Sequence, residues 1–144
     1  MLMAEPRLNA QQREEVTRRA RGHCEYCLSQ ELYSPDPFSV EHITPLAKGG
    51  THDLENLAWS CQGCNSRKYV TIEALDPVTG QTVPLYHPRH DRWLEHFAWN
   101  EDDTLVIGLT PTGRATVEKL QLNRSGVVNL RRVLSFMDLH PPED

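Results

Sequence analysis

The sequence predicts an α+β fold of strand, loop, strand and helix, with a further helix before it and a mixed extension after it. Alternating apolar residues between two cysteine pairs indicate the strands, and helical spacing before the first pair and after the second indicates the helices. The chain has 144 residues, and a hydrophobic content of 38% is enough for one modest core rather than two. We therefore expect a single domain with appendages.

The first half of the chain contains the regular pattern. Residues 9–21 place polar residues around two apolar positions and predict an amphipathic helix with Asn9 as its N-cap. Residues 38–43 alternate as a short strand would, and residues 57–59 fit a second strand. Residues 65–69 contain no helix breaker, so we expect a helix to begin there, with its N-terminus facing the strands.

The second half shows a different pattern. A turn is expected at residues 76–80, a strand at 104–110, and helices at 114–122 and 129–139. In the last helix, four apolar residues form one stripe: Leu130, Val133, Leu134 and Met137. The large aromatic residues Trp93, Phe97 and Trp99 are expected in the core or at a docking surface rather than as a base-stacking platform. We divide the chain into a core at residues 1–72 and an extension of unknown role at 73–144 that packs on it.

Charge gives a mixed indication. A formal charge of -5 and a pI near 5.8 argue mildly against a non-specific nucleic-acid binder, because phosphate neutralisation usually needs a basic face. A locally basic cleft remains open, since the cations cluster: Arg18, Arg19 and Arg21, then Arg67 and Lys68, then Arg131 and Arg132.

No apolar run approaches the roughly 20 residues that cross a bilayer. The opening segment also lacks an apolar stretch typical of a secretory signal: MLMAEPRLNAQQREE. We therefore expect a soluble, cytoplasmic protein with no membrane partner.

The four cysteines form two Cys-x2-Cys pairs, Cys24 with Cys27 and Cys61 with Cys64. In a reducing compartment this spacing is typical of metal ligation, and two such turns supply a tetrahedral set for zinc at about 2.3 Å per sulfur. The alternatives are two adjacent disulfides or four unrelated thiols. We favour a zinc site that stabilises the fold.

An ordered set of motifs spans the two cysteine pairs: Cys24-x2-Cys27, Glu41-His42-Ile43-x-Pro45, Gly49-Gly50, Asn56-Leu57, and Cys61-x2-Cys64-Asn65-x2-Lys68. This set resembles the HNH endonuclease family. The resemblance implies the ββα-metal fold, in which two strands and a helix enclose one catalytic metal ion. It also implies metal-dependent hydrolysis of phosphodiester bonds in DNA.

His42 is the natural general base for such a reaction, because an imidazole with a pKa of about 6.5 accepts a proton at neutral pH. By resemblance, its ring is oriented by a backbone carbonyl or by the neighbourhood of Asn56. We expect Asn56 to orient structure in the catalytic site rather than to contact substrate. His52 lies on a loop and is not required by this mechanism.

The catalytic metal ligands are assigned by resemblance to Glu41 and Asn65, whose oxygen donors suit Mg2+ or Mn2+. The alternatives are an exposed carboxylate and a helix cap. Arg67 and Lys68 are expected in the first helical turn, where they contact phosphate or form a solvated face. A second histidine group, His87, His90 and His96, is better explained by structural hydrogen bonds than by another metal site.

Two other functions remain open beside the DNA endonuclease. One is a zinc-stabilised nucleic-acid-binding module that has lost catalysis, and the other is an RNA-directed nuclease. The sequence does not separate RNA from DNA, because the expected site binds a phosphate rather than a sugar. We favour the enzyme, since the candidate base and ligands are all present.

Overall fold

The computed structural model describes residues 8–143. The expected outer boundaries of the core and the extension, at residues 1 and 144, lie outside this range. The first residues of the opening segment, where we expect no secretory signal, also lie outside it. The expected α+β fold is confirmed. Within the described range, short antiparallel strand pairs alternate with helices: α1 (Ala10–Ala20), β1 (Ser39–His42), β2 (Leu57–Ser60), α2 (Gln62–Lys68), β3 (Glu73–Leu75), β4 (Thr82–Pro84), α3 (Trp93–His96), β5 (Phe97–Trp99), β6 (Val106–Gly108), α4 (Pro111–Leu120) and α5 (Ser125–Phe136).

Helix α1 begins where the sequence predicts it. The Asn9 side chain accepts a hydrogen bond from the Gln12 backbone N–H at 2.8 Å, and the Gln12 side chain accepts one from the Asn9 N–H at 3.0 Å. This reciprocal capping box satisfies two N–H groups that a helix start leaves unpaired. Val16 and Ala20 on one face are buried, which anchors the helix beside β2.

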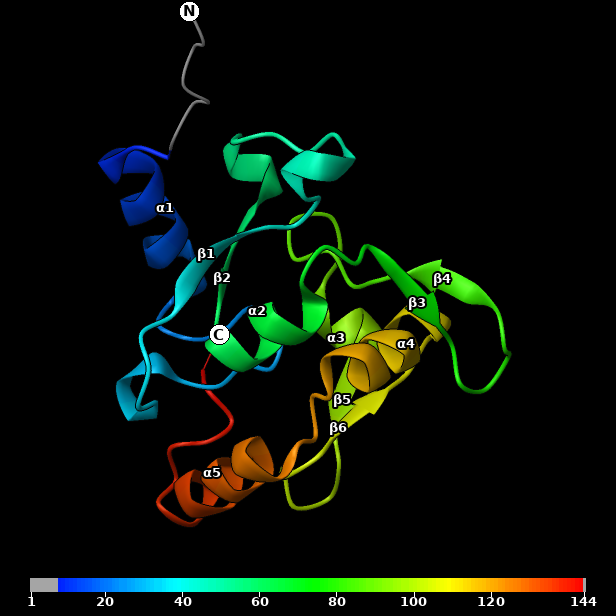
Figure 1. Cartoon of the computed structure of the whole chain (residues 1–144). Coiled ribbons are helices and arrows are strands. Elements are labelled where there is room, and N and C mark those ends of the chain that lie inside the picture. Colours follow the sequence, from blue (N-terminus) through cyan, green and yellow to red (C-terminus); the bar gives the residue numbers. More distant parts are fainter. Residues whose placement is uncertain (1–7, 144) are drawn as a thin grey trace, which may run out of the picture.

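Strands β1 and β2 pair antiparallel, with Glu41 opposite Ala58 and His42 opposite Leu57. Helix α2 follows directly and lies between this strand pair and α4 (Figure 1). It begins at Gln62, earlier than predicted, because the Cys61 sulfur accepts a hydrogen bond from the Cys64 N–H at 3.4 Å and caps the helix. Arg67 and Lys68 therefore lie in the last turn of α2, and their expected place in the first turn is wrong.

The second half forms two strand pairs, β3 with β4 and β5 with β6, packed against α4. Thr110 caps α4 by accepting a hydrogen bond from the Gly113 N–H at 2.9 Å, and Pro111 occupies its first turn. A Cβ at Gly113 would collide with the His96 carbonyl oxygen, so only glycine lets α4 approach α3 this closely. Helix α4 also packs on α2, which joins the second half to the first.

Helix α5 differs from its prediction. It begins at Ser125 and ends at Phe136, and its buried face is formed by Val127, Arg131 and Leu134. Val133 and Met137 are 57% and 60% exposed, so the predicted apolar stripe is wrong for these two residues. The reason is that Arg131, rather than a leucine or valine, occupies the centre of the inward face.

Burial of arginine and lysine also changes the expected charge pattern. Arg131 is only 3% exposed and donates to the carbonyl oxygens of Thr104 at 3.0 Å and Leu122 at 2.8 Å. Lys68 is 1% exposed. Neither residue contributes to a basic surface, which corrects the grouping of Arg131 with Arg132 and of Lys68 with Arg67.

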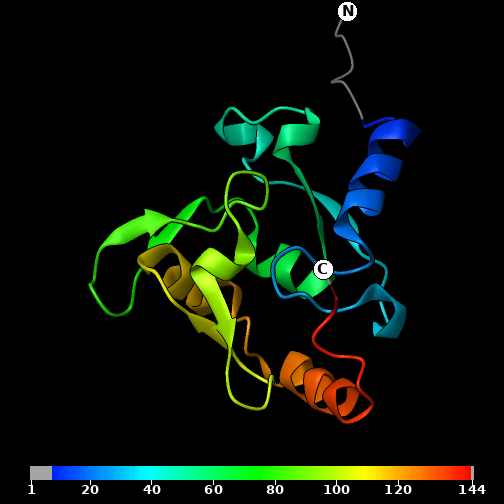
Figure 2. The ribbon, with the colours of Figure 1, turned by 180° about the vertical axis from the view of Figure 1, so that it is seen from behind.

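The aromatic residues of the second half are part of the core, as expected. Phe97 is fully buried, and Trp93 and Trp99 pack against the buried cluster. The Trp93 indole N–H donates to the Tyr26 carbonyl oxygen at 3.0 Å, which ties this cluster to the first cysteine turn. Figures 1 and 2 show α1 and α5 at opposite ends of the molecule, with α2 between them. No helix within residues 8–143 is long and apolar enough to span a membrane.

Candidate functional site

The four cysteines converge in one buried cluster. Their sulfur atoms all lie within 4.8 Å of one another, and all four thiols are free of disulfide bonds. The Sγ atoms of Cys27 and Cys61 are 3.7 Å apart. Four sulfurs placed tetrahedrally at about 2.3 Å from a zinc ion would be about 3.8 Å apart, so the cluster has the donors and the size for zinc. The alternative of two adjacent disulfides is wrong for this structure, because the four thiols are free and lie together in one cluster.

Arg124 connects the cysteine cluster to the second half of the chain. Its guanidinium donates to Cys61 Sγ at 3.3 Å and to Cys64 Sγ at 3.6 Å. Burial lowers the pKa of Arg124, but the nearby cysteine sulfurs raise it more, so the net shift is upward and favours the cation. Sequence reasoning missed this residue, because nothing in its local pattern distinguishes it from the other arginines.

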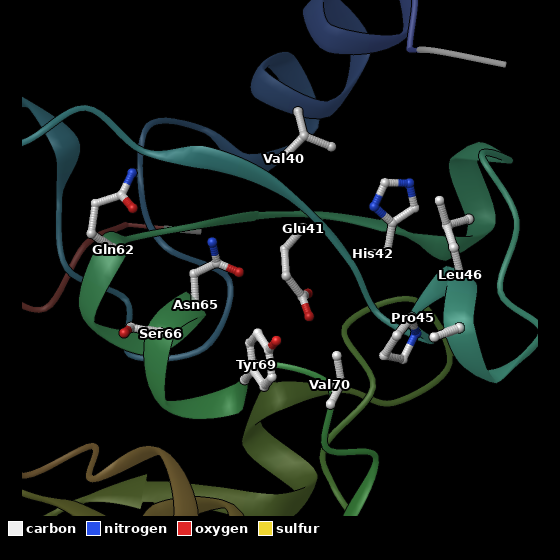
Figure 3. A pocket seen from close by; sticks show the side chains of 11 residues that line it. Val40, Glu41, His42, Pro45, Leu46, Gln62, Asn65, Ser66, Tyr69 and Val70 are labelled. Carbon is white, nitrogen blue, oxygen red and sulfur yellow. The ribbon is translucent and has the colours of Figure 1, made fainter. Parts of the chain in front are cut away.

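A pocket of about 510 Å³ lies at the end of β1, beside α2 and the turn that follows Pro45 (Figure 3). It brings together three of the residues expected in the catalytic site, namely Glu41, His42 and Asn65. Arg67, Lys68 and Asn56 do not line it.

Glu41 is 4% exposed and holds two partners. The Tyr26 hydroxyl donates to Oε2 at 2.6 Å, and the Lys68 ammonium lies 2.6 Å from Oε1. Burial raises the pKa of Glu41, while Lys68 and Tyr26 lower it, and the net shift is upward. Oε1 has an ion-pair partner but no well-oriented hydrogen bond among the described residues, so it keeps a lone pair for another cation.

The charged end of Lys68 contacts buried groups of the candidate site. Besides Glu41, its ammonium donates to the Ile43 carbonyl oxygen at 2.7 Å. The expectation that Lys68 contacts phosphate is therefore wrong, because its charged end is enclosed between β1 and the start of the following loop. Lys68 holds the Glu41 carboxylate in place instead.

His42 lies at the end of β1, with its ring half-buried. Its Nε2 is 3.0 Å from Nδ1 of His52, on the loop after β1. Figure 3 shows the other ring nitrogen turned toward the side of the pocket where Glu41 and Asn65 lie. Burial, and then the neighbouring His52, lower the pKa of His42, which favours the neutral imidazole that a general base requires.

Asn56 holds the loop between β1 and β2. Its Oδ1 accepts from the Thr44 N–H at 2.8 Å, and its Nδ2 donates to the carbonyl oxygens of Thr44 at 2.9 Å and Thr51 at 2.8 Å. The loop passes so close that a Cβ at Gly50 would collide with the Thr44 carbonyl oxygen. These contacts use the whole Asn56 amide to fix the loop that carries His52.

Asn65 lies in α2 and directs its side chain into the pocket (Figure 3). Its amide makes no side-chain hydrogen bond within residues 8–143, so its oxygen is available to a ligand. Arg67 is exposed and lines a separate pocket of about 480 Å³ together with Arg124. Its guanidinium also donates to the Gly63 carbonyl oxygen at 3.2 Å.

The second histidine group makes structural contacts. The His87 and His90 rings stack at 3.8 Å, and His87 Nδ1 accepts from the backbone N–H groups of Arg89 and His90 at 3.2 Å. His96 Nδ1 lies 2.6 Å from the Thr110 hydroxyl. Among the described residues, the four cysteines are the one group of three or more possible ligands that lie close enough together to bind a metal ion. The three histidines do not form such a group.

Two strands and a helix surround a pocket lined by His42, Glu41 and Asn65, and the four-cysteine cluster lies beside them. Residues 24–71, one third of the chain, match the family model described as HNH endonuclease. The matched segment includes both cysteine pairs and every residue that lines the His42 pocket. No curated protein and no solved structure matches the chain.

Proposed function

We propose that this protein is a metal-dependent endonuclease that hydrolyses phosphodiester bonds in DNA. The observation that carries the proposal is the placement of His42, Glu41 and Asn65 around one open pocket within the segment that matches the HNH endonuclease model. Hydrolysis of a phosphodiester needs a base for the attacking water and compensation of the charge that develops on oxygen. This pocket offers candidates for both.

His42 acts as the general base. The ring nitrogen that faces the pocket accepts the proton of the attacking water, and the lowered pKa of His42 keeps that nitrogen unprotonated at neutral pH. Glu41 and Asn65 would hold the catalytic metal, since both line the pocket and carry oxygen donors. A bound Mg2+ or Mn2+ would neutralise charge on the phosphoryl and leaving oxygens. Lys68 and Tyr26 orient the Glu41 carboxylate.

Arg67 is the proposed contact to substrate phosphate. It is exposed in the last turn of α2 and lines the neighbouring pocket with Arg124, where two guanidinium groups could bind a phosphate outside the His42 pocket. The cysteine cluster is proposed to hold a structural zinc ion. Residues 73–144 are proposed to form an extension that packs on the core through α4 and Arg124. The four free thiols support the cytoplasm as the compartment.

The proposal is tested by incubating supercoiled plasmid with the purified protein and Mg2+, Mn2+ or EDTA. His42→Ala is expected to reduce cleavage by about 10²- to 10⁴-fold, the usual contribution of a general base. His90→Ala, which removes an exposed histidine outside the pocket, serves as the matched control and should cleave as the unmodified protein does. Unchanged cleavage by His42→Ala at saturating DNA would overturn the mechanism.

One observation favours a second candidate, a zinc-stabilised binding module without catalysis. The Lys68 ammonium already pairs with Glu41 and competes with a metal ion for the same oxygen. If the protein is such a binding module, it should slow the migration of plasmid in a gel-shift assay and produce no relaxed circles with any metal. An RNA of matched sequence, added in the same assay, separates an RNA-directed nuclease from a DNA endonuclease.

A further inference from the structure

His42 and His52 form a direct ring-to-ring contact that the general mechanism does not require. The two ring centroids are 5.0 Å apart with an interplanar angle of 72°, and His42 Nε2 is 3.0 Å from His52 Nδ1. The distance is that of a hydrogen bond, so one of these nitrogens carries a proton and the other accepts the hydrogen bond. The direction of this bond determines which nitrogen of His42 is free.

We propose that His52 is a positioning residue that fixes His42 as the tautomer with its proton on Nε2. This inference rests on the proposed nuclease function, in which Nδ1 of His42 faces the attacking water. A neutral imidazole carries one ring proton, so an unprotonated Nδ1 requires Nε2–H. His52 Nδ1 accepts that hydrogen bond, and the proton of the neutral His52 ring is then on its own Nε2.

The backbone that carries His52 is held from two sides. Its own carbonyl oxygen accepts a hydrogen bond from Gln12 Nε2 at 2.8 Å, and the carbonyl oxygen of Thr51 accepts one from Asn56 Nδ2 at 2.8 Å. The Thr51 hydroxyl donates to the Asp53 carboxylate at 3.0 Å and accepts from the Asp53 N–H at 3.2 Å. These bonds hold the backbone from which the His52 ring reaches His42.

Gln12 connects this arrangement to α1. The same amide caps the helix through its oxygen and holds the His52 carbonyl through its nitrogen. One side chain therefore links α1 to His52, the residue that contacts His42. A Gln12→Glu variant keeps an oxygen for the cap and removes the nitrogen donor, so it loosens His52 without removing a ring atom.

The experiment compares His52→Asn with His52→Leu, and uses His90→Asn as the control outside the pocket. Asparagine places Oδ1 as many bonds from Cα as histidine places Nδ1, so it can accept from His42 Nε2–H, whereas leucine cannot. We expect His52→Leu to lower kcat by about 10- to 100-fold, as removal of an orienting partner does at metal sites, with little change in KM. We expect His52→Asn to retain most of kcat. Equal kcat for the unmodified protein and the leucine variant, or equal loss in both variants, would overturn the proposal.

A second readout does not depend on cleavage. Nitrogen-15 NMR of the imidazole rings identifies which nitrogen of neutral His42 is protonated. We expect Nε2–H in the unmodified protein, in His52→Asn and in His90→Asn, a tautomer mixture in His52→Leu, and a partial shift toward the mixture in Gln12→Glu. Observation of Nδ1–H in the unmodified protein contradicts the proposal even if the protein cuts DNA. A protein that shows the expected tautomers but cuts nothing would contradict the nuclease function alone.

Discussion

At the scale of single residues, the pair of Glu41 and Lys68 is the most constrained contact in the candidate site. The two side chains are only 3% and 2% exposed, and their charged atoms are 2.6 Å apart. Burial of two charges costs several kcal/mol each, and the mutual attraction of the pair and the hydrogen bonds from Tyr26 and to Ile43 offset this cost. Such a pair is costly to break on one side only.

Lys68→Met is expected to destabilise the protein by about 3 to 5 kcal/mol, because it leaves the Glu41 carboxylate buried without a cation. Urea-induced unfolding at neutral pH measures this change. The double variant Lys68→Met, Glu41→Gln removes both charges and should recover much of the loss. A double variant that is no more stable than Lys68→Met would show that packing, rather than the unpaired charge, causes the loss.

Residues with a fixed sequence spacing were predictable, and those with partners far along the chain were not. The cysteine pairs follow from spacing, and their convergence is confirmed by the structure. His52, Lys68 and Arg124 gain their roles from contacts made across loops and between halves of the chain. A basic residue at the end of a short helix gives no sequence signal that its charge will be buried.

At the scale of elements, the turn between β3 and β4 is joined to α4 by one buried carboxylate. Asp76 accepts from the Thr79 hydroxyl at 2.8 Å within the turn, and from Arg114 Nε and Nη2 at 2.9 Å. The Arg114 guanidinium, followed by hydrogen bonds from Thr79 and Val78, holds the pKa of Asp76 well below its ordinary value of 3.8, against the effect of burial. The hairpin is thereby fixed to the helix by a bidentate ion pair.

Asp76→Asn is expected to reduce stability at neutral pH and to lose this effect in acid. Because the folded pKa is depressed, the carboxylate stabilises the protein above its ordinary pKa, and this stabilisation is lost as the pH falls through and below that value. Thermal unfolding at a series of pH values should show the two proteins converging below about pH 4. Glu118→Gln, an exposed change on α4, provides the control. A stability difference that stays constant with pH would contradict the ion pair.

Local signals predicted elements well where a cap or an alternation defined them. The Asn9 cap of α1 and the strands β1 and β2 are confirmed. The start of α2 was missed because a cysteine caps it, and the start of α5 was missed because Arg124 provides no side-chain cap. The buried face of α5 was misjudged because burial of Arg131 depends on carbonyl oxygens in other segments.

At the scale of the whole molecule, the cysteine cluster joins the two halves of the chain. Four thiolates around one zinc ion leave excess negative charge, and Arg124 places a guanidinium against two of the sulfurs. Arg131 donates to the Cys27 carbonyl oxygen at 3.3 Å, from the adjacent face of the cluster. A metal ion bound by the four cysteines would therefore be coupled to the placement of α5.

Arg124→Met is expected to weaken zinc binding by about 10- to 100-fold, the usual effect of removing a residue that supports metal ligands. Competition with a chromogenic zinc chelator measures the affinity. Arg132→Met removes an exposed arginine from α5, the helix that follows Arg124, and is the matched control. Equal zinc affinity in both variants would show that the guanidinium only fills space beside the sulfurs.

Because the Lys68 amine is enclosed, its rate of chemical modification can measure local opening of the folded protein. The sequence contains three lysines, and Lys48 and Lys119 are exposed whereas the Lys68 amine is sealed against Glu41. An acylating reagent should therefore modify Lys48 and Lys119 rapidly in the folded protein and reach Lys68 only when the segment between β1 and α2 opens. Mass spectrometry of timed acylation would then give the opening rate at the centre of the candidate site, with the two exposed lysines as internal standards. Rapid acylation of Lys68 in the native protein would mean that the ion pair opens on the timescale of the reagent.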